Sequence, residues 1–251
     1  MTLTTSAVIS ADVCDPAHVF GMHGDGARGF SHWKCLTRRL GLAGDWEAVE
    51  WACLPPGGAC GAHVHTRTEE LYFILTGTGR IAWEGDSQEV RAGDLILTPL
   101  GARHGLTNTG TDPLRWLVVE VSAPAQSAAI AGRPVANETT TTGEPVSLHI
   151  VNLREVGRFD ATTVLDGPVR DIRMMRLAPG EGLDLDASDS EYTIFTVAGR
   201  GTAVDGDATS DLMAGVAMTL PLGTRVRAQA VDDAELELFV ARLAVDEEAV
   251  T

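Results

Sequence analysis

The sequence predicts an all-β fold built from two tandem barrels. Three observations lead to this prediction: short runs of β-branched and aromatic residues, many glycines and prolines, and an internal repeat. The 27 glycines and 11 prolines are spread along 251 residues and supply the tight turns that short strands need. Helical periodicity is scarce, which leaves a β-sandwich or β-barrel as the natural class.

The expected strands are short segments bounded by turn residues. They lie at 70–75, 80–83, 94–98 and 114–121 in the first half, and at 193–197, 216–220 and 236–241 in the second. Their composition favours strands because β-branched and aromatic side chains fit a pleated, half-buried surface.

An internal repeat predicts the domain organisation. The segment RTEELYFILTGTG (67–79) aligns with DSEYTIFTVAGRG (189–201), and AGDLILTPLGARHGLTN (92–108) aligns with AGVAMTLPLGTRVRAQA (214–230), both at an offset of 122 residues. One gapless offset across two turn-containing segments indicates a tandem duplication. We therefore expect a domain at 1–121, an Ala-, Thr-, Ser-, Gly- and Pro-rich linker at 122–147, and a second domain at 148–251.

Four polar residues of the first half have the spacing of a metal site. His63 and His65 are two residues apart on an expected strand, so both side chains face the same side. We expect Glu70 past a short turn on the neighbouring strand, and His104 on a later strand. Three imidazoles and one carboxylate suit one divalent transition metal ion per chain, which could be Mn, Fe, Ni, Co, Cu or Zn. Such a set leaves coordination positions open for a small chelating substrate.

The same residues lie within two longer patterns. Residues 57–77 read G-x5-H-x-H-x4-E-x6-G, and residues 93–108 read G-x5-P-x-G-x2-H-x3-N. These patterns resemble the two signature motifs of the cupin superfamily. The resemblance implies a bicupin of two jelly-roll (double-stranded β-helix) barrels, with His63, His65, Glu70 and His104 as the metal ligands of the N-terminal barrel.

The second copy keeps the turn residues and loses the ligands. At the offset of 122, the four ligand positions are occupied by Leu185, Ala187, Tyr192 and Val226. No histidine follows His149 in the sequence. We therefore expect a C-terminal barrel that binds no metal.

Two neighbouring glutamates compete for the fourth ligand position. Strand alternation allows only one of Glu69 and Glu70 to face the barrel interior. Counting back seven residues from Gly77, as the cupin pattern does, selects Glu70. Glu69 persists in the repeat as Glu191, which indicates a structural role. Tyr72 has the same strand parity as Glu70, so we expect it to face the metal cavity as the one candidate catalytic side chain.

Several other residues allow two interpretations each. The tryptophans line a substrate pocket or close the barrel core and the interface between barrels; they are Trp33, Trp46, Trp51, Trp83 and Trp116. An N-terminal arm folds over a barrel mouth or forms an ordinary loop or edge strand; its histidines are His18, His23 and His32. Arg38 and Arg39 attract an anionic substrate or form a solvated pair.

The four cysteines all lie in the first quarter of the chain and form no CxxC pair; they are Cys14, Cys35, Cys53 and Cys60. We expect free buried thiols rather than disulfides or a zinc site. The N-terminus shows no signal peptide, and no apolar stretch is long enough to span a membrane. These features together favour a cytoplasmic protein.

The net charge of the chain excludes some classes of function. The formal net charge of −16 argues against nucleic acid and anionic membranes as partners. The leading hypothesis is a metal-dependent enzyme that acts on a small molecule, either a dioxygenase or a cyclase/isomerase of specialised metabolism. The alternative is a non-catalytic bicupin that binds a metal or small ligand for sensing or storage, because the sequence shows no general acid or base beyond the metal ligands. We expect a monomer or a homodimer.

Overall fold

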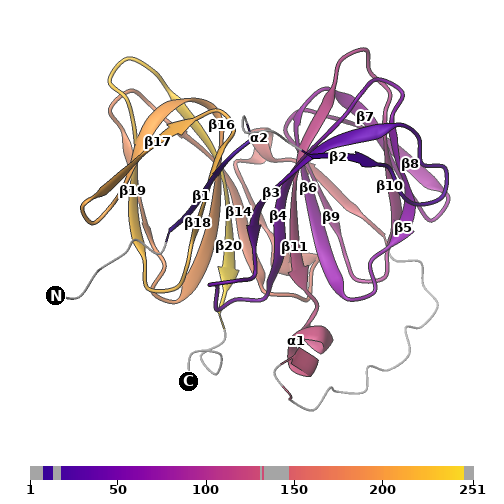
Figure 1. Ribbon diagram of the computed structural model, residues 1–251, viewed down its shortest axis with the longest axis horizontal. Helices are drawn as coiled ribbons and strands as arrows, with labels where there is room; N and C mark the ends of the chain where they lie inside the picture. The colour runs from indigo at the N-terminus through magenta and orange to yellow at the C-terminus, as the bar shows by residue number, and fades with distance from the viewer. Residues whose placement is uncertain (1–7, 14–17, 131, 133–146, 246–251) are drawn as a thin grey trace.

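The computed structural model describes residues 8–13, 18–130, 132 and 147–245. Two β units lie side by side in it (Figure 1). We call β2–β12 the N-terminal unit, and β1 together with β13–β20 the C-terminal unit. The all-β class predicted from the sequence is confirmed.

The N-terminal unit consists of two antiparallel sheets. The larger sheet has the order β12 (His149–Asn152), β9 (Asp94–Thr98), β6 (Thr68–Thr76), β11 (Leu114–Ser122), β4 (Trp46–Leu54), β3 (Phe30–Arg38) and β2 (His18–Gly21). The smaller sheet has the order β5 (Ala59–Val64), β10 (Arg103–Asn108), β7 (Thr78–Trp83) and β8 (Asp86–Arg91). A core between them includes Ile74, Ile81, Leu106 and Trp116.

The C-terminal unit is organised around the 16-residue strand β16 (Ser190–Asp205). Its first part pairs with β18 (Val216–Leu220) and β20 (Leu236–Ala244), and its last part pairs with β17 (Ala208–Met213) and β19 (Arg225–Ala230). The remaining strands are β14 (Val169–Leu177) beside β20, β13 (Arg158–Asp160) beside β14, and β15 (Gly182–Asp186) beside β19.

Short helices follow the two places where the chain leaves the N-terminal unit. Helix α1 (Pro124–Ile130) begins the expected linker, and most of the linker's remainder lies outside the described residues. Helix α2 (Leu153–Val156) follows β12, with the Asn152 side chain accepting a hydrogen bond from the Glu155 amide as its N-cap. A 3-10 turn follows at Ala161–Thr163. In the described part of the chain, no helix has the length and hydropathy that a membrane span requires.

Equivalent strands of the two units pair in the same register. Glu70 lies opposite Thr98 on β9, and Tyr192 lies opposite Leu220 on β18, both shifted by the repeat offset. The shared turn glycines have a physical reason. Gly77 and Gly199 have φ of +88° and +85°, and a Cβ on either would meet the backbone of the opposite strand's first residues. The repeat therefore corresponds to one pairing scheme used twice.

Each unit also takes one strand from the other half of the chain. Strand β1 (Ile9–Asp12) pairs with β18, so Ile9 lies opposite Thr219. Strand β12 pairs with β9, so His149 lies opposite Leu97, the position equivalent to Thr219. This reciprocal exchange joins the units, and the sequence repeat did not predict it.

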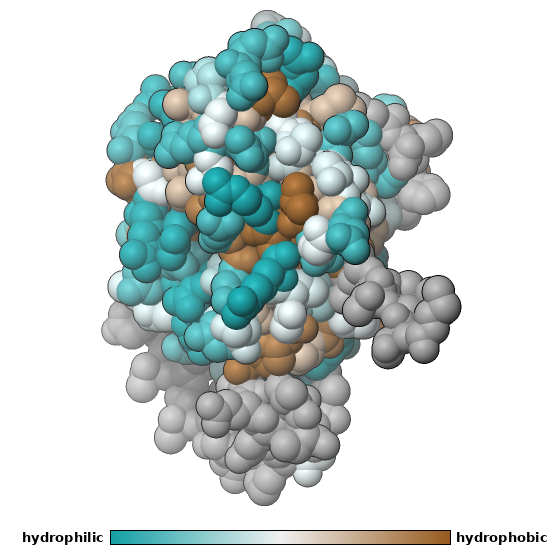
Figure 2. Space-filling model, turned by 90° about the vertical axis from the view of Figure 1, so that its left-hand side faces the viewer, coloured by the Kyte–Doolittle hydropathy of each residue, from teal (hydrophilic) through white to brown (hydrophobic). Residues whose placement is uncertain are grey.

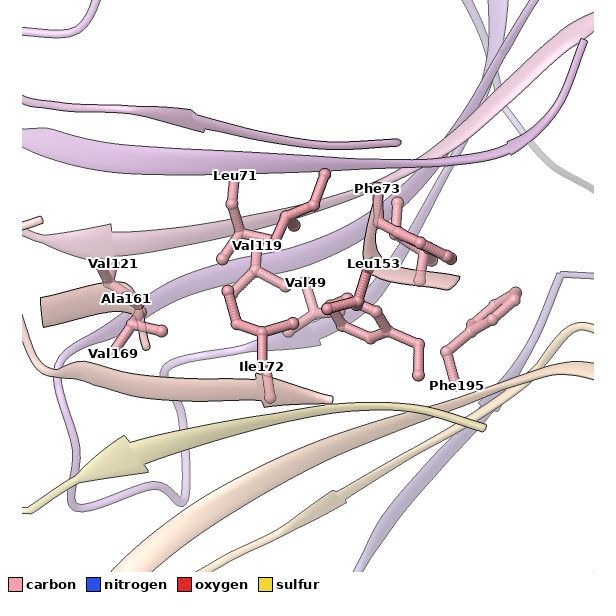
Figure 3. Packing of buried hydrophobic residues seen from close by; sticks show 14 of the residues in the cluster. Val49, Leu71, Phe73, Val119, Val121, Leu153, Ala161, Val169, Ile172 and Phe195 are labelled. Carbon is pink, nitrogen blue, oxygen red and sulfur yellow. The ribbon is translucent and has the colours of Figure 1, made fainter. Parts of the chain in front are cut away.

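A shared hydrophobic core fills the space between the larger sheets of the two units (Figure 3). Alternate residues of β6, including Leu71 and Phe73, face this core, while Tyr72 and Ile74 face the interior of their own unit. Phe73 stacks on Phe239 of β20 with a ring-centroid distance of 5.0 Å. Burial of these rings makes the interface part of the folded core rather than a loose contact.

The outer surface of the C-terminal unit is mostly hydrophilic. Figure 2 views the molecule from that side, and hydrophobic side chains appear there only in small areas between hydrophilic ones. Its large exposed hydrophobic side chains include Val204 and Met213. Scattered apolar areas of this kind are ordinary for a protein surface.

Candidate metal centre

The four expected ligands lie close together in the structure. Three of them are on strands, and the fourth follows the end of one of these strands. His63 on β5 lies directly opposite His104 on β10 in the smaller sheet. His65 follows the end of β5, and Glu70 lies on β6 of the larger sheet. One expectation was wrong: Glu70 does not come from the strand next to β5. It reaches the histidines from the opposite sheet, because the chain crosses between the sheets after His65.

The donor atoms of these residues converge. One ligand atom from each of the four residues lies within 4.8 Å of all the others. The Nε2 atoms of His63 and His65 are 3.2 Å apart, and Glu70 Oε2 lies 2.9 Å from His104 Nε2. Glu70 and His104 are buried, with exposed fractions of 4% and 0%. Buried polar groups gathered at these distances need a compensating partner.

Hydrogen bonds at the far side of two imidazoles fix which nitrogen faces inward. His63 Nδ1 lies 2.8 Å from the Gly61 carbonyl oxygen, and His65 Nδ1 lies 3.0 Å from Glu120 Oε1. Because these oxygens only accept, each Nδ1 carries the proton and each Nε2 presents a lone pair to the centre. Metal-binding histidines are oriented by such outer carbonyl and carboxylate partners.

The residues fit a divalent cation on the evidence of the close spacing of their donor atoms. Two Nε2 lone pairs at 3.2 Å repel each other, and the buried Glu70 Oε2 lies 2.9 Å from His104 Nε2 and 3.4 Å from His65 Nε2. A cation between them would satisfy all three atoms. Three nitrogens and one oxygen match the donors that first-row transition metals prefer.

At neutral pH His63 and Glu70 are in the forms that bind a metal ion, whereas for His65 the carboxylates of Glu120 and Glu70 outweigh burial and raise the pKa. Burial lowers the pKa of His63 to about 4, so this imidazole is neutral. Burial by itself would raise the pKa of Glu70, but the three surrounding histidines outweigh it and hold the pKa below its usual value. Neutral imidazole and ionised carboxylate are the forms that bind a metal ion.

A cavity of about 510 Å³ reaches this cluster. Three of the four ligands, all except the fully buried His104, contribute to its wall. Tyr72 lines it as expected, with its hydroxyl 3.4 Å from His104 Nε2. Its other lining residues are Gly21, Met22, His23, Ser31, Trp33, Arg38, Glu50, Ala52, Cys60, Trp116, Val118 and Glu120. This volume lies in the range of pockets that enclose small organic ligands.

Two acidic residues of the cavity were missed by the sequence reasoning, which found no acid or base beyond the ligands. Glu120 lies opposite Glu70 in the strand register and accepts a hydrogen bond from Thr68 Oγ1 at 3.1 Å. Glu50 accepts one from Trp33 Nε1 at 2.6 Å, and burial raises its pKa against the opposing effects of Trp33 and Arg38. The alternation of Trp116, Val118 and Glu120 on one strand was the available signal.

The tryptophans divide between the two interpretations. Trp33 and Trp116 line the cavity, whereas Trp46 is fully buried at the unit interface and donates a hydrogen bond to Glu191 Oε2 at 2.8 Å. Trp51 packs against the core shared by the units, and Trp83 packs against the core of its own unit. The role of each tryptophan therefore depends on the side of the strand to which its side chain points.

The histidines of the N-terminal arm also differ from one another in role, and so do Arg38 and Arg39. His23 lines the cavity, with its ring centroid 4.8 Å from that of His63, while His32 on β3 is exposed. The side chain of His18 lies outside the described part of the structure. Arg38 lines the cavity mouth and forms an ion pair with Glu50 at 3.4 Å. Arg39 instead pairs with Asp45 at 2.8 Å and has no part in the site.

The described cysteines are free thiols. Cys35 is half-buried, and Cys53 and Cys60 are buried. Burial raises the pKa of Cys60 to about 12, so it stays a neutral thiol beside His63. Cys14 lies outside the described residues.

Glu69 has the structural role expected of it. Its carboxylate is buried and accepts hydrogen bonds from the backbone amides of Asp166 and Gly167 at 2.9 and 2.7 Å. The equivalent Glu191 accepts from the amides of Ala43 and Gly44, each at 2.9 Å. Each glutamate thus fastens a loop that precedes a strand of the other half, which explains why both copies keep it.

The ligand positions of the C-terminal unit are filled by its hydrophobic core. Leu185, Ala187 and Val226 are buried there, and Tyr192 packs against them. The register of Leu185 opposite Val226 repeats that of His63 opposite His104. Among the described residues of this unit, no group of metal-binding side chains converges.

Part of the N-terminal unit is similar to a known domain family. Residues 50–120 match the model of the cupin domain. An oxalate-binding protein of Thermotoga maritima is 39% identical over 66 residues, which cover 26% of this chain and 54% of that protein. The chain thus matches about half the length of such curated relatives.

Solved structures resemble the fold of the chain over most of its length. Protein Ylba of Escherichia coli superposes with a TM-score of 0.70 at 12% identity, covering 96% of this chain and 92% of that one. A variant of Bacillus subtilis oxalate decarboxylase superposes with a TM-score of 0.64 at 16% identity, covering 95% and 77%. At these identities the likeness concerns the fold, and together with the domain match it supports the cupin superfamily.

Proposed function

We propose that the chain is a metal-dependent enzyme that binds a small, oxygen-bearing organic substrate in the cavity of the N-terminal unit. The observation that carries this proposal is the convergence of four side chains that could hold a metal ion, three of them in the wall of a cavity of about 510 Å³. A purely structural metal site would be closed by protein side chains. This one leaves room for a ligand next to the metal-binding atoms.

The proposed architecture is a bicupin. It consists of a metal-binding cupin barrel at 1–121, a linker at 122–147 and a metal-free cupin barrel at 148–251. The sequence repeat and the equal strand registers of the two units support this division. The exchanged strands β1 and β12 would then hold the two barrels together.

The residues of the chain would divide the work in the cavity. His63, His65, Glu70 and His104 would hold the metal ion, which would act as a Lewis acid toward a chelating substrate. Glu120 orients His65 through its Nδ1 proton, and Tyr72 presents a hydroxyl beside His104. Glu50 is the candidate proton donor, because its raised pKa keeps more of the acid form near neutral pH. Trp33 and Trp116 would pack against the substrate's apolar part.

Relatives suggest the first metal and ligands to test. The similar Thermotoga protein is named for oxalate binding, and the structurally similar Bacillus oxalate decarboxylase has Mn(II) centres. We propose oxygenation or cyclisation/isomerisation as the reaction classes, with Mn and Fe as the first metals. The 510 Å³ cavity exceeds what a two-carbon dianion fills, so larger carboxylates and phenols belong in the same screen.

Turnover by the reconstituted protein tests the proposal. Chain loaded with Mn(II) or Fe(II) is incubated with oxalate and larger carboxylates and phenols, and products are followed by NMR together with O2 consumption. We expect turnover that is lost in His104→Ala, and a rate lowered by about 100-fold in Glu50→Gln. Tyr72→Phe should keep its metal while its rate falls. The exposed Glu89→Gln is the matched control and should behave as wild type.

A non-catalytic ligand-binding role is the second candidate, and the likeness to an oxalate-binding protein favours it. It predicts saturable binding of a screened ligand to the metal-loaded protein without any product. That outcome across the whole screen would replace the enzyme proposal by the binding one.

A further inference from the structure

The C-terminal unit has a cavity of its own, at the place that corresponds to the metal cavity. Its volume is about 260 Å³. It is lined by Asp171, Arg173, Met175, Leu183, Asp184, Leu185, Asp186, Tyr192, Val240 and Arg242. The unit thus keeps a pocket although it has lost the metal ligands.

Two wall positions of this cavity carry the opposite charge from their counterparts in the metal cavity. Arg242 lies opposite Tyr192 in the strand register, just as Glu120 lies opposite Glu70. Arg173 lies opposite Val240, just as Glu50 lies opposite Val118. The two acidic wall residues of the N-terminal unit are therefore both replaced by arginine.

The arginines exceed the acidic groups available to them. Asp171 is buried and receives contacts from the Nε atoms of Arg173, of Arg242 at 3.0 Å and of Arg158 at 3.1 Å. Since a guanidinium has five N–H donors, contacts through Nε leave donors for a second acceptor. Arg242 also donates to Ser190 Oγ at 3.4 Å. Asp160 lies opposite Asp171 in the strand register, so two carboxylates face three guanidiniums, which leaves a local excess of positive charge.

The other two aspartates of the wall have counterions of their own. Asp184 pairs with Arg227 at 2.7 Å, and Asp186 pairs with Arg225 at 2.9 Å. They therefore leave the excess charge at Arg173 and Arg242 in place. This positive site lies in a chain of net charge −16, where a solvated surface would be expected to carry acidic groups.

The floor of the cavity is apolar. Leu185 stands at the position of His63, and Leu183, Met175 and Val240 line the wall beside it. Tyr192 at the position of Glu70 is half-buried and adds a phenol hydroxyl. An arginine pair above an apolar floor recognises an anion whose body is hydrophobic, because planar guanidinium groups match a carboxylate in two-point hydrogen bonds.

We propose that the C-terminal unit binds a small organic carboxylate, with its carboxylate group on Arg173 and Arg242 and its apolar body against Leu185 and Met175. The volume of about 260 Å³ limits the ligand to a few carbon atoms or one ring, below the size of most drug-like ligands. The unit is then a second ligand site rather than scaffold alone.

Benzoate is the probe, because it combines a carboxylate with one apolar ring. Isothermal titration and ligand-observed NMR on the full chain should show saturable binding of one benzoate per chain in the presence of EDTA. Binding should persist in the double variant His63→Ala/His104→Ala, which separates this site from the metal cavity. Neutral benzamide, of the same shape, should bind at least about 10-fold more weakly.

Variants of the cavity decide the assignment. Arg173→Gln should weaken benzoate binding at least about 10-fold, because a charged hydrogen-bond donor is lost. Asp171→Asn should strengthen it, because the competing carboxylate is removed. Arg200→Gln, whose arginine pairs with Asp233 away from the cavity, should bind as wild type. Circular dichroism of each variant checks folding, and Arg173→Lys replaces Arg173→Gln if the latter unfolds.

Three results would overturn the proposal. Benzoate would fail to bind saturably, or it would bind no better than benzamide, or binding would be lost with His63 and His104 while Arg173→Gln leaves it unchanged. The arginines would then serve only to neutralise Asp171 and fasten strands β13, β14 and β20.

Discussion

The two units of this chain show which residues a β fold needs and which only its chemistry needs. Both keep the turn glycines, the strand register and the buried glutamate that fastens a loop of the other half. They differ at the ligand positions and at two wall positions, where His63 corresponds to Leu185 and Glu120 to Arg242. The backbone conformation constrains the first group of residues, whereas the second group can change freely once the interior remains filled.

The units are nevertheless not independent. They share the hydrophobic core around Phe73 and Phe239, they exchange strands, and Thr37 Oγ1 lies 2.7 Å from Thr219 Oγ1 across the interface. The face of β6 that carries Leu71 and Phe73 packs against the C-terminal unit, while the face that carries Glu70 and Tyr72 lines the cavity.

The largest effect on stability is expected from the shared core. Phe73→Ala should lower the free energy of unfolding by about 3–5 kcal/mol, because it leaves a cavity beneath Phe239. Urea unfolding followed by circular dichroism reports both units, and tryptophan fluorescence reports the N-terminal unit, which contains all five tryptophans. The two signals should change together. Separate transitions would show that the units unfold independently. The control variant is Phe30→Ala, because the Phe30 side chain is 63% exposed.

A smaller effect is expected at the arginine cluster of the C-terminal unit. The charged hydrogen bonds of Asp171 outweigh its burial and hold its pKa below the usual 3.8. The contribution of the carboxylate is therefore complete above about pH 4 and is lost as the pH falls through the lowered pKa. Asp171→Asn should lower the free energy of unfolding by about 1.5–3 kcal/mol at pH 7.

Urea titrations at three pH values check this sign. The difference between wild type and Asp171→Asn should be as large at pH 4.5 as at pH 7, and should shrink below pH 3.8. The matched control is Asp184→Asn, whose exposed pair should contribute less than about 1 kcal/mol. A difference that grows on acidification would contradict the account.

In the N-terminal unit, the residue behind a metal ligand should tune metal affinity. Glu120→Ala removes the acceptor of the His65 Nδ1 proton, and we expect an affinity loss of about 10–100-fold. Competition with a chelating dye measures it, with Glu89→Ala as the exposed control. An unchanged affinity would mean that Glu120 does not orient His65.

Much of this picture could be predicted from the sequence because it depends on local spacing. The strands at 94–98 and 216–220 agree with β9 and β18, and the four proposed ligands converge. Glycine turns and the i, i+2 spacing of His63 and His65 are readable in a few residues, and the repeat tests them a second time.

The remainder depends on long-range pairing that local patterns do not encode. Glu50 and Glu120 reach the cavity only because β4, β11 and β6 pair in a particular register. The exchange of β1 and β12 between the units, and the approach of Glu70 from the opposite sheet, are likewise set by the topology. The inversion from Glu120 to Arg242 was visible at the offset of 122, but its meaning required the position of the cavity.

Metal content tests the central claim most directly. Protein purified without a nickel affinity column is analysed by inductively coupled plasma mass spectrometry, as wild type and as His63→Ala/His104→Ala. The account predicts about one transition metal ion per wild-type chain and essentially none in the double variant. Two ions per wild-type chain, or one ion retained by the double variant, would contradict a single site in the N-terminal unit.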